Sequence, residues 1–288
     1  RSLRPDRLSR GVCVEIYLYQ GLIGLTYSMY LWLLAAGLSI AFGVLGILNF
    51  SHGALFMIGA YLAFTFYGML GLNFWLAVLL SALSVALLGA VLERFFLRHI
   101  YTLDLPFQLL LTFGFVLIFD DLVKMAWGGM FMIPPMPPFL TGSVPLFGRP
   151  FPIYNLFILF VGVAVAVGIW LLFDRTWWGR KVRAAAWNRE MGSMLGLNVP
   201  RLYMVVFMFA AGLAALGGAL SIPMRPVTPG LGTAMIIQAF IVAVIGGLGN
   251  LRGAFVGAIV VGMLTVYSTM LFPLFELFLP YVVMAAVL

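Results

Sequence analysis

The sequence predicts an all-α polytopic membrane protein, formed by residues 1–288 as a single transmembrane domain. Of its 288 residues, 64% are hydrophobic and 9% are charged, whereas a soluble domain contains about 25% charged residues. Apolar runs about 20 residues long, enough to span a bilayer as a helix, recur along the chain. None alternates with the two-residue period of a barrel strand. This composition excludes a cytosolic enzyme.

About eight hydrophobic helices or helix pairs are expected. The first run, Val12–Asn49, is roughly twice as long as one crossing needs. The later runs are Ala54–Leu72, Phe74–Leu92, Leu105–Trp127, Ile153–Phe173, Leu202–Ile222, Ala234–Leu248, Ala254–Leu271 and Leu277–Leu288. Because the last run is short and the chain does not begin with Met, we expect trimming at one or both ends and a truncated last span.

The basic residues predict the orientation, because cytoplasmic loops of membrane proteins are enriched in Lys and Arg. Thirteen of the 16 basic residues share one side if the N-terminus is cytoplasmic: Arg1, Arg4, Arg7, Arg10, Arg94, Arg98, Arg175, Arg180, Lys181, Arg183, Arg189, Arg201 and Arg252. The Pro-rich loop 128–152 then lies outside with Lys124, Arg149 and Arg225. The net charge of +7 therefore indicates topology and a lipid environment, with no nucleic-acid partner.

This orientation requires an even number of crossings between Arg10 and Arg94. We expect an outward span over Val12–Ala35, a separate descending arm over Leu38–Phe50, and a return over Ala54–Tyr67. A descending arm of about 12 residues is shorter than a full span, which favours a broken, re-entrant helix over a full hairpin.

A second break is expected over residues 246–253, between apolar arms on either side. It reads Arg252-Gly253-Ala254 where the first reads His52-Gly53-Ala54, and paired Gly-interrupted segments in two halves of a transporter indicate its substrate path. The two breaks therefore indicate an internal parallel repeat, or else reflect the abundance of Gly and Ala in membrane helices.

Polar residues at the first break are candidates for a solute pathway. Asn49, Ser51 and His52, with Gly53, stand between apolar arms, where an unmet hydrogen bond is costly. The structural alternative is that Ser51 caps a helix starting at Ala54. A proton relay through His52 would need a paired acidic group, and none is obvious.

Three further candidates for the pathway are Thr112, Gly249 and Asn250. Thr112 lies within an apolar run, where it could instead allow close packing. Gly249, Gly253 and Gly257 are spaced by four, which favours helix–helix contact in lipid over contact with a substrate.

The loop 174–201 is basic and contains an Ala-rich stretch that favours a short helix. We expect a charged helix parallel to the membrane, which serves either as a docking surface for a soluble partner or only as a topology signal.

Motifs for chemistry are missing from the sequence. It contains no G-x-x-x-x-G-K-[ST] nucleotide loop, no H-E-x-x-H and no G-x-S-x-G, and Cys13 is its one cysteine. We therefore expect no catalytic residue, no metal site and no cofactor in this chain.

Four segments, taken together, resemble the branched-chain amino-acid ABC permeases of the Liv type. The segment ending Asn49-Phe50-Ser51-His52-Gly53 is similar to the family's N-F-[AS]-H-G signature. Three others follow in the family's order: Glu93-Arg94 with Arg98, the stretch from Gly179 to Asn198, and the Gly-rich stretch from Gly246 to Ala258.

The resemblance implies a permease of an ATP-binding-cassette importer in a bacterial inner membrane. It implies a second homologous permease subunit, two cytoplasmic ATPase subunits that bind ATP and Mg, and a periplasmic substrate-binding protein. The residues that would meet the ATPase are Arg183, Ala184, Asn188, Arg189, Glu190, Leu195, Gly196 and Asn198. The solute would be a branched-chain or related amino acid, and the family's other small polar solutes stay open. The alternative is an ion- or proton-coupled secondary transporter, which would need a coupling site within the membrane.

Overall fold

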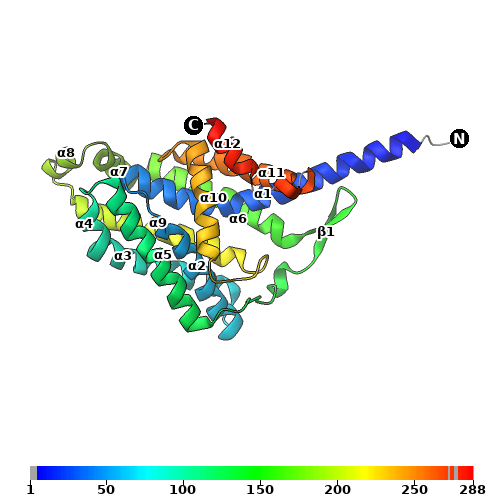
Figure 1. Cartoon of the computed structure of the whole chain (residues 1–288), viewed down its shortest axis with the longest axis horizontal. Coiled ribbons are helices and arrows are strands. Elements are labelled where there is room, and N and C mark those ends of the chain that lie inside the picture. The colour runs from blue at the N-terminus through cyan, green and yellow to red at the C-terminus, as the bar shows by residue number, and fades with distance from the viewer. Residues whose placement is uncertain (1–4, 272, 276–277, 288) are drawn as a thin grey trace.

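The computed structural model describes residues 5–271, 273–275 and 278–287, and side chains from Val14 onward (Figure 1). The predicted Arg1, Arg4 and the end of the last apolar run at Leu288 lie outside the described residues. Nearly all regular structure is helical. The exception is a hairpin of β1 (Ser143–Leu146) and β2 (Arg149–Pro152), antiparallel with Ser143 opposite Pro152.

The long helices follow the predicted apolar runs closely. They are α1 (Pro5–Leu45), α2 (Ser51–Phe64), α3 (Phe74–Leu92), α5 (Leu105–Trp127), α6 (Ile153–Trp170), α9 (Val199–Ser221), α10 (Leu231–Gly246) and α11 (Leu251–Leu271). π-Helical turns over Thr65–Met69, Glu93–Leu97 and Leu171–Arg175 extend α2, α3 and α6, and 3-10 turns cover Pro138–Leu140 and Pro273–Phe275. The short helices are α4 (Arg98–Ile100), α7 (Trp177–Trp187), α8 (Arg189–Met194) and α12 (Leu279–Val287).

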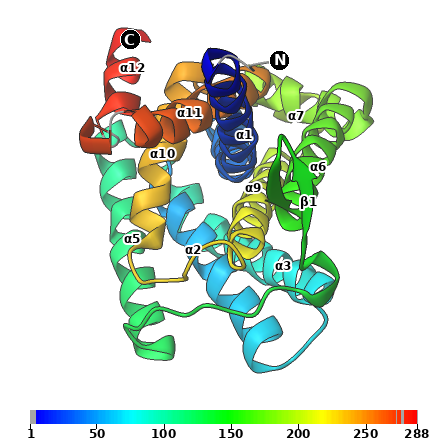
Figure 2. The same ribbon diagram turned by 90° about the vertical axis from the view of Figure 1, so that its right-hand side faces the viewer.

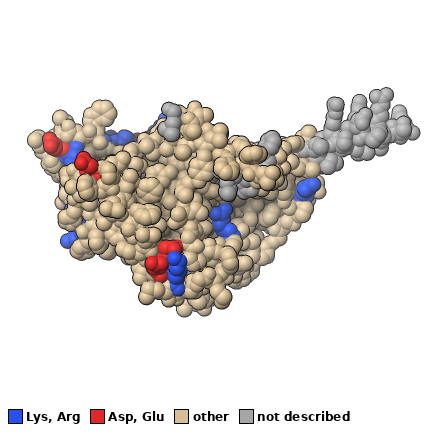
Figure 3. Space-filling model, viewed as in Figure 1, with Lys and Arg blue, Asp and Glu red and all other residues tan. Residues whose placement is uncertain are grey.

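Six helical segments in the described part of the chain are long and apolar enough to cross a membrane. The shorter α10 is apolar too. Most of the surface visible in Figure 3 is uncharged, and its charged side chains occur in a few small groups. The prediction of an all-α polytopic membrane protein is confirmed.

Helix α9 forms the centre of the bundle and packs against α1, α2 and α3. Figure 2, which looks along α1, shows α9 beside α1, with α2 and α3 beyond it. The buried face of α9 is rich in small residues, among them Ala210, Ala214 and Gly218. Small side chains let helix backbones approach closely, which is how helices gain contact energy where lipid supplies no hydrophobic driving force.

The predicted interruption of α1 between Ala35 and Leu38 is wrong, because α1 is one continuous helix to Leu45. Ala35 and Ala36 are fully buried, so apolar packing continues through the expected break. The chain turns after Leu45, with Gly46 at φ 72°. The start of α2 then lies beside the middle of α1, since a β-carbon on Gly37 would lie 2.6 Å from the His52 ring. The turn therefore folds back into the bundle.

The predicted common side for the N-terminal arginines and loop 174–201 is also wrong. Near its start, α1 contacts the hairpin, where the Tyr19 hydroxyl donates to the Pro150 carbonyl at 3.2 Å. Near its end, Ser39 and Gly43 line a cavity together with Arg183. Figure 1 shows the same separation, with the first turns of α1 at the end of the molecule that carries β1, and α7 and α8 at the opposite end. Because α1 is one continuous helix, Arg7 and Arg10 at its start and the loop 174–201 lie at opposite ends of the bundle.

The second break is a tight turn between α10 and α11. Gly247 and Gly249 have φ of 86° and 81°, a backbone conformation that favours glycine. A β-carbon on Gly253 would overlap the Gly246 carbonyl, so the two helices cross with their backbones in contact. The interpretation of the glycine series as a packing stripe is confirmed for Gly253 and Gly257, which face α10.

Candidate functional site

The first break is built around a helix cap. The Asn49 carbonyl oxygen Oδ1 accepts the Ser51 amide at 3.0 Å and the Ser51 hydroxyl at 2.6 Å. Helix α2 begins at Ser51, three residues before the expected Ala54. A capping role is therefore present, but Asn49 provides it and Ser51 does not.

The other residues of the first break are packed inside the subunit. His52 is 0% exposed, and neither ring nitrogen has a hydrogen-bond partner among the described residues. A β-carbon on Gly53 would overlap the Gly232 carbonyl, so α2 and α10 meet here backbone to backbone. This burial favours a structural role for the segment, and its contact with solute stays a prediction.

Two of the three remaining pathway candidates lie at a cavity. Gly249 and Asn250 line a cavity of about 410 Å³ at the end of α1, and Asn250 Oδ1 also accepts the Gly253 amide at 3.1 Å, which caps α11. Thr112 is buried, and its hydroxyl donates to the Gln108 carbonyl in the preceding turn of α5.

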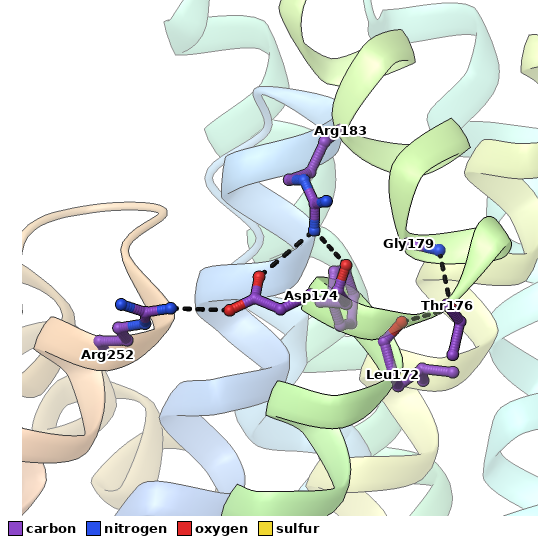
Figure 4. Close-up of polar contacts among 7 residues, drawn as sticks. Leu172, Asp174, Thr176, Gly179, Arg183 and Arg252 are labelled. Atoms are coloured by element: carbon purple, nitrogen blue, oxygen red, sulfur yellow. Dashed lines mark hydrogen bonds and ion pairs between the residues drawn. The ribbon is translucent and has the colours of Figure 1, made fainter.

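Asp174 joins three segments at this cavity (Figure 4). Its Oδ2 accepts Arg252 Nη2 of α11 at 2.7 Å, and its Oδ1 accepts Arg183 Nη1 of α7 at 3.3 Å. Arg183 also donates to the Phe173 carbonyl. The predicted partner-facing residue Arg183, whose side chain is 48% exposed, therefore ties α7 to the end of α6. Sequence reasoning missed Asp174 and Arg252 as partners because 78 residues separate them.

The predicted charged helix in loop 174–201 is present as two helices, α7 and α8. Thr176 caps α7 by accepting the Gly179 amide at 3.0 Å (Figure 4). Asn188 and Asn198 cap α8 and α9 by accepting the Met191 and Arg201 amides at 2.9 and 3.1 Å. These two asparagines, selected as partner contacts, therefore fix helix starts.

An apolar surface is exposed in the middle of the loop 174–201, from the last residue of α7 to the end of α8. It is formed by Trp187, Met191, Met194 and Leu195. Their exposures are 93%, 59%, 85% and 75%. Ala184, Glu190 and Gly196 are exposed beside them, and Gly196 has φ 81°. We call these four residues the α8 apolar surface. Sequence reasoning selected only Leu195 of the four, although large apolar residues within a charged loop were a usable signal.

Arg189 connects α8 to the end of α3. Its guanidinium lies 5.6 Å from the ring centres of both Tyr101 and Tyr203. The Tyr101 hydroxyl donates to Glu93 Oε1 at 2.7 Å. Burial, and then the hydrogen bond to Glu93, raise the pKa of Tyr101 well above its usual value, so the hydroxyl keeps its proton at physiological pH. The Glu93 and Arg189 segments, far apart in sequence, thus form one cluster.

A bundle of long apolar helices with a pair of capped short helices at one end is the architecture of a polytopic membrane protein. The family model described as "Branched-chain amino acid transport system / permease component" matches residues 21–288. The chain belongs to this family.

Individual relatives agree with the family. The chain is 29% identical to the high-affinity branched-chain amino acid transport system permease protein BraD of Pseudomonas aeruginosa, over 89% of this chain and 87% of the relative. It is 26% identical to LivH of Salmonella typhimurium, a permease protein of the same description, over 88% and 86%. A fructose import permease protein, FrcC of Rhizobium meliloti, is 32% identical over 41% of this chain. No solved structure matches.

Proposed function

We propose that this chain is a permease subunit of an ATP-binding-cassette importer that moves a branched-chain or related amino acid into the cytoplasm. The support for import of such a solute is family membership over residues 21–288. The observation that carries the dependence on an ATPase is the α8 apolar surface, because large apolar side chains exposed together mark sites of protein interaction.

The occupant of the α8 apolar surface is a cytoplasmic ATPase subunit. The surface lies on a short helix that is capped at Asn188 and held by Arg189 against two tyrosines. A rigid, water-exposed helix beyond the ends of the long helices suits contact with a soluble subunit. In this proposal the α7–α8 end faces the cytoplasm, and the hairpin and loop 128–152 face the periplasm of a bacterial inner membrane.

The other subunits of the importer are inferred because, in this proposal, one chain provides only half of the solute pathway. A second homologous permease completes it, a second ATPase pairs with the first, and a periplasmic substrate-binding protein delivers the solute. ATP and Mg bind to the ATPase subunits, and no cofactor is assigned to this chain.

Substituting Met194→Asp tests the ATPase contact. A charge at the centre of an apolar interface is expected to release most of the ATPase, since a desolvated unpaired charge costs several kcal/mol. The measurement is the amount of ATPase that copurifies with the tagged permease, together with ATP-driven uptake in vesicles. Met130→Asp is the matched control, because Met130 is 78% exposed in the loop at the opposite end.

Two results contradict the proposal. Undiminished copurification with Met194→Asp would contradict docking at the α8 apolar surface. Uptake that survives ATP depletion and stops when the proton gradient collapses would indicate a secondary transporter.

A further inference from the structure

A second cavity of about 400 Å³ lies at the other end of the bundle, where α1, α10, α11 and α12 meet. Its polar lining includes Tyr27, Arg225, Gln238 and Thr265, and isoleucines form an apolar wall: Ile23, Ile237 and Ile241. The volume lies within the range of about 300–1,000 Å³ found for small-molecule sites. A few polar groups beside an apolar wall suit a small solute with one charged end.

The backbone that carries Arg225 is held on both sides, because the Arg225 amide donates to the Ser221 carbonyl at 3.2 Å and two further contacts follow it in the chain. Val227 forms a two-way backbone bridge with Met132, at 3.1 and 2.9 Å. The Gly230 amide donates to Asp120 Oδ1 at 2.6 Å, and Pro226 and Pro229 restrict the chain around these contacts. The backbone of Arg225 is therefore fixed beside the cavity that its side chain lines.

The guanidinium of Arg225 has hydrogen-bond donors to spare. Its carbon lies 5.3 Å from the Tyr27 ring centre, and Nη1 lies 3.2 Å from the Met235 sulfur, a weak acceptor. Within the described residues, which do not include Glu276, no carboxylate lies within 4.0 Å of it. Because a guanidinium carries five N–H donors in a planar fork, it can bind a carboxylate through two parallel bonds.

Gln238 offers a further donor on the same cavity. The Tyr27 hydroxyl donates to Gln238 Oε1, which orients the side-chain amide and leaves its Nε2 group as a donor. Two donor groups, one of them charged, thus stand beside an apolar wall.

We propose that this cavity binds the carboxylate of an apolar solute at the hairpin end of the permease, with Arg225 as the carboxylate ligand. The inference rests on the proposed import function for the direction of travel and names the chemical class that this subunit recognises: a monocarboxylate with an apolar side chain. An anionic lipid headgroup would satisfy the same guanidinium and is the competing source.

The test measures protection of a cysteine in the cavity, without any ATPase. In a Cys13→Ala background, Ala234→Cys places a thiol on an exposed lining position, and its labelling by a methanethiosulfonate is followed in phosphatidylcholine nanodiscs. The probes are L-leucine, 4-methylpentanoate, which keeps the carboxylate but lacks the ammonium group, and L-leucinol, which lacks the carboxylate. We expect L-leucine and 4-methylpentanoate to slow labelling and L-leucinol to leave it unchanged.

Variants of Arg225 test whether its guanidinium is responsible for the protection from labelling. Arg225→Gln should raise the concentration for half-protection by about tenfold or more, because a charged, paired hydrogen bond is lost, and Arg225→Lys should restore part of the protection. Arg149→Gln, in the exposed hairpin, is the matched control. Gel filtration of each variant separates lost binding from lost folding.

Three results would overturn the inference: no protection by either carboxylate, equal protection by L-leucinol, or protection that persists in Arg225→Gln. Slower labelling after addition of phosphatidylglycerol, without any effect of solute, would assign the cavity to lipid and overturn it as well. Since the assay needs no ATPase, its failure would leave the importer proposal standing. Failure of the importer proposal would likewise leave a positive protection result standing.

Discussion

At the residue scale, asparagine has one recurring role in this chain: it starts helices. Asn49, Asn73, Asn188, Asn198 and Asn250 each accept a backbone amide at or near the first turn of the following helix. A carbonyl oxygen on a short side chain reaches the free amides of a helix start, which otherwise lack partners. In a membrane protein such a hydrogen bond matters most where the start of the helix is buried, as at Asn49.

Removing the buried cap should therefore destabilise the protein more than removing its neighbour. Asn49→Ala deletes the acceptor of two hydrogen bonds, whereas Ser51→Ala deletes one donor and keeps the backbone bond. We expect a loss of about 1–2 kcal/mol for Asn49→Ala and a smaller loss for Ser51→Ala. Thermal unfolding in detergent, followed by size exclusion, measures both. An equal or larger effect of Ser51→Ala would show that Asn49 is not the cap.

At the element scale, the contacts of Asp174 link the loop that contains α7 and α8 to the start of α11. Arg252 and Asp174 are exposed by 79% and 36% at their side chains, and such pairs contribute only about 0–1 kcal/mol to stability. We therefore expect the ion pair to matter more for linking α7 to α11 than for the stability of the fold. If the ATPase pushes on α8, the force reaches the second break through α7 and Asp174.

Breaking this pair should reduce transport without reducing stability. We expect Asp174→Ala and Arg252→Ala to leave the unfolding temperature nearly unchanged and to lower the solute imported per ATP hydrolysed. The double variant should be no worse than Asp174→Ala alone, because Asp174→Ala already removes the link to Arg252. Lys124→Ala, which breaks a comparable pair on α5, serves as the control. Additive losses in the double variant would mean that the two residues act separately.

At the scale of the whole molecule, the continuous α1 decides the topology. It joins the hairpin end to the end that carries α7 and α8, so we expect an odd number of crossings before Arg94. The charge pattern alone led to an even number, because it assigned the N-terminal arginines to the cytoplasm. The expected topology therefore depends on the continuity of α1, which a count of basic residues does not reveal.

Labelling single cysteines from one side of the membrane tests this topology. In a Cys13→Ala background, we expect Ser143→Cys in β1 and Ser9→Cys in α1 to react with an impermeant thiol reagent applied to the same side. Ala184→Cys in α7 should react only from the opposite side, because one crossing separates it from the start of α1. Reaction of Ser9→Cys and Ala184→Cys from one side would contradict the single crossing of α1.

Much of the architecture was predictable because hydrophobic runs report directly on burial in lipid. The runs that start at Phe74 and Leu105 matched α3 and α5 at both ends, and the Ala-rich loop gave a helical region as expected. The break at Asn49 was located from the sequence, but its contacts were not predicted. The side chains that meet His52 depend on how α1 and α9 fold back over it.

The class of protein, the helical runs and the family could be predicted from the amino-acid sequence alone, since these depend on local hydrophobicity and on short motifs. Only the tertiary structure decided that α1 is continuous, that Asp174 reaches Arg252 and that Arg225 faces a cavity with Tyr27. These features depend on contacts between segments up to about 200 residues apart in sequence, and no local pattern encodes the packing that brings such segments together.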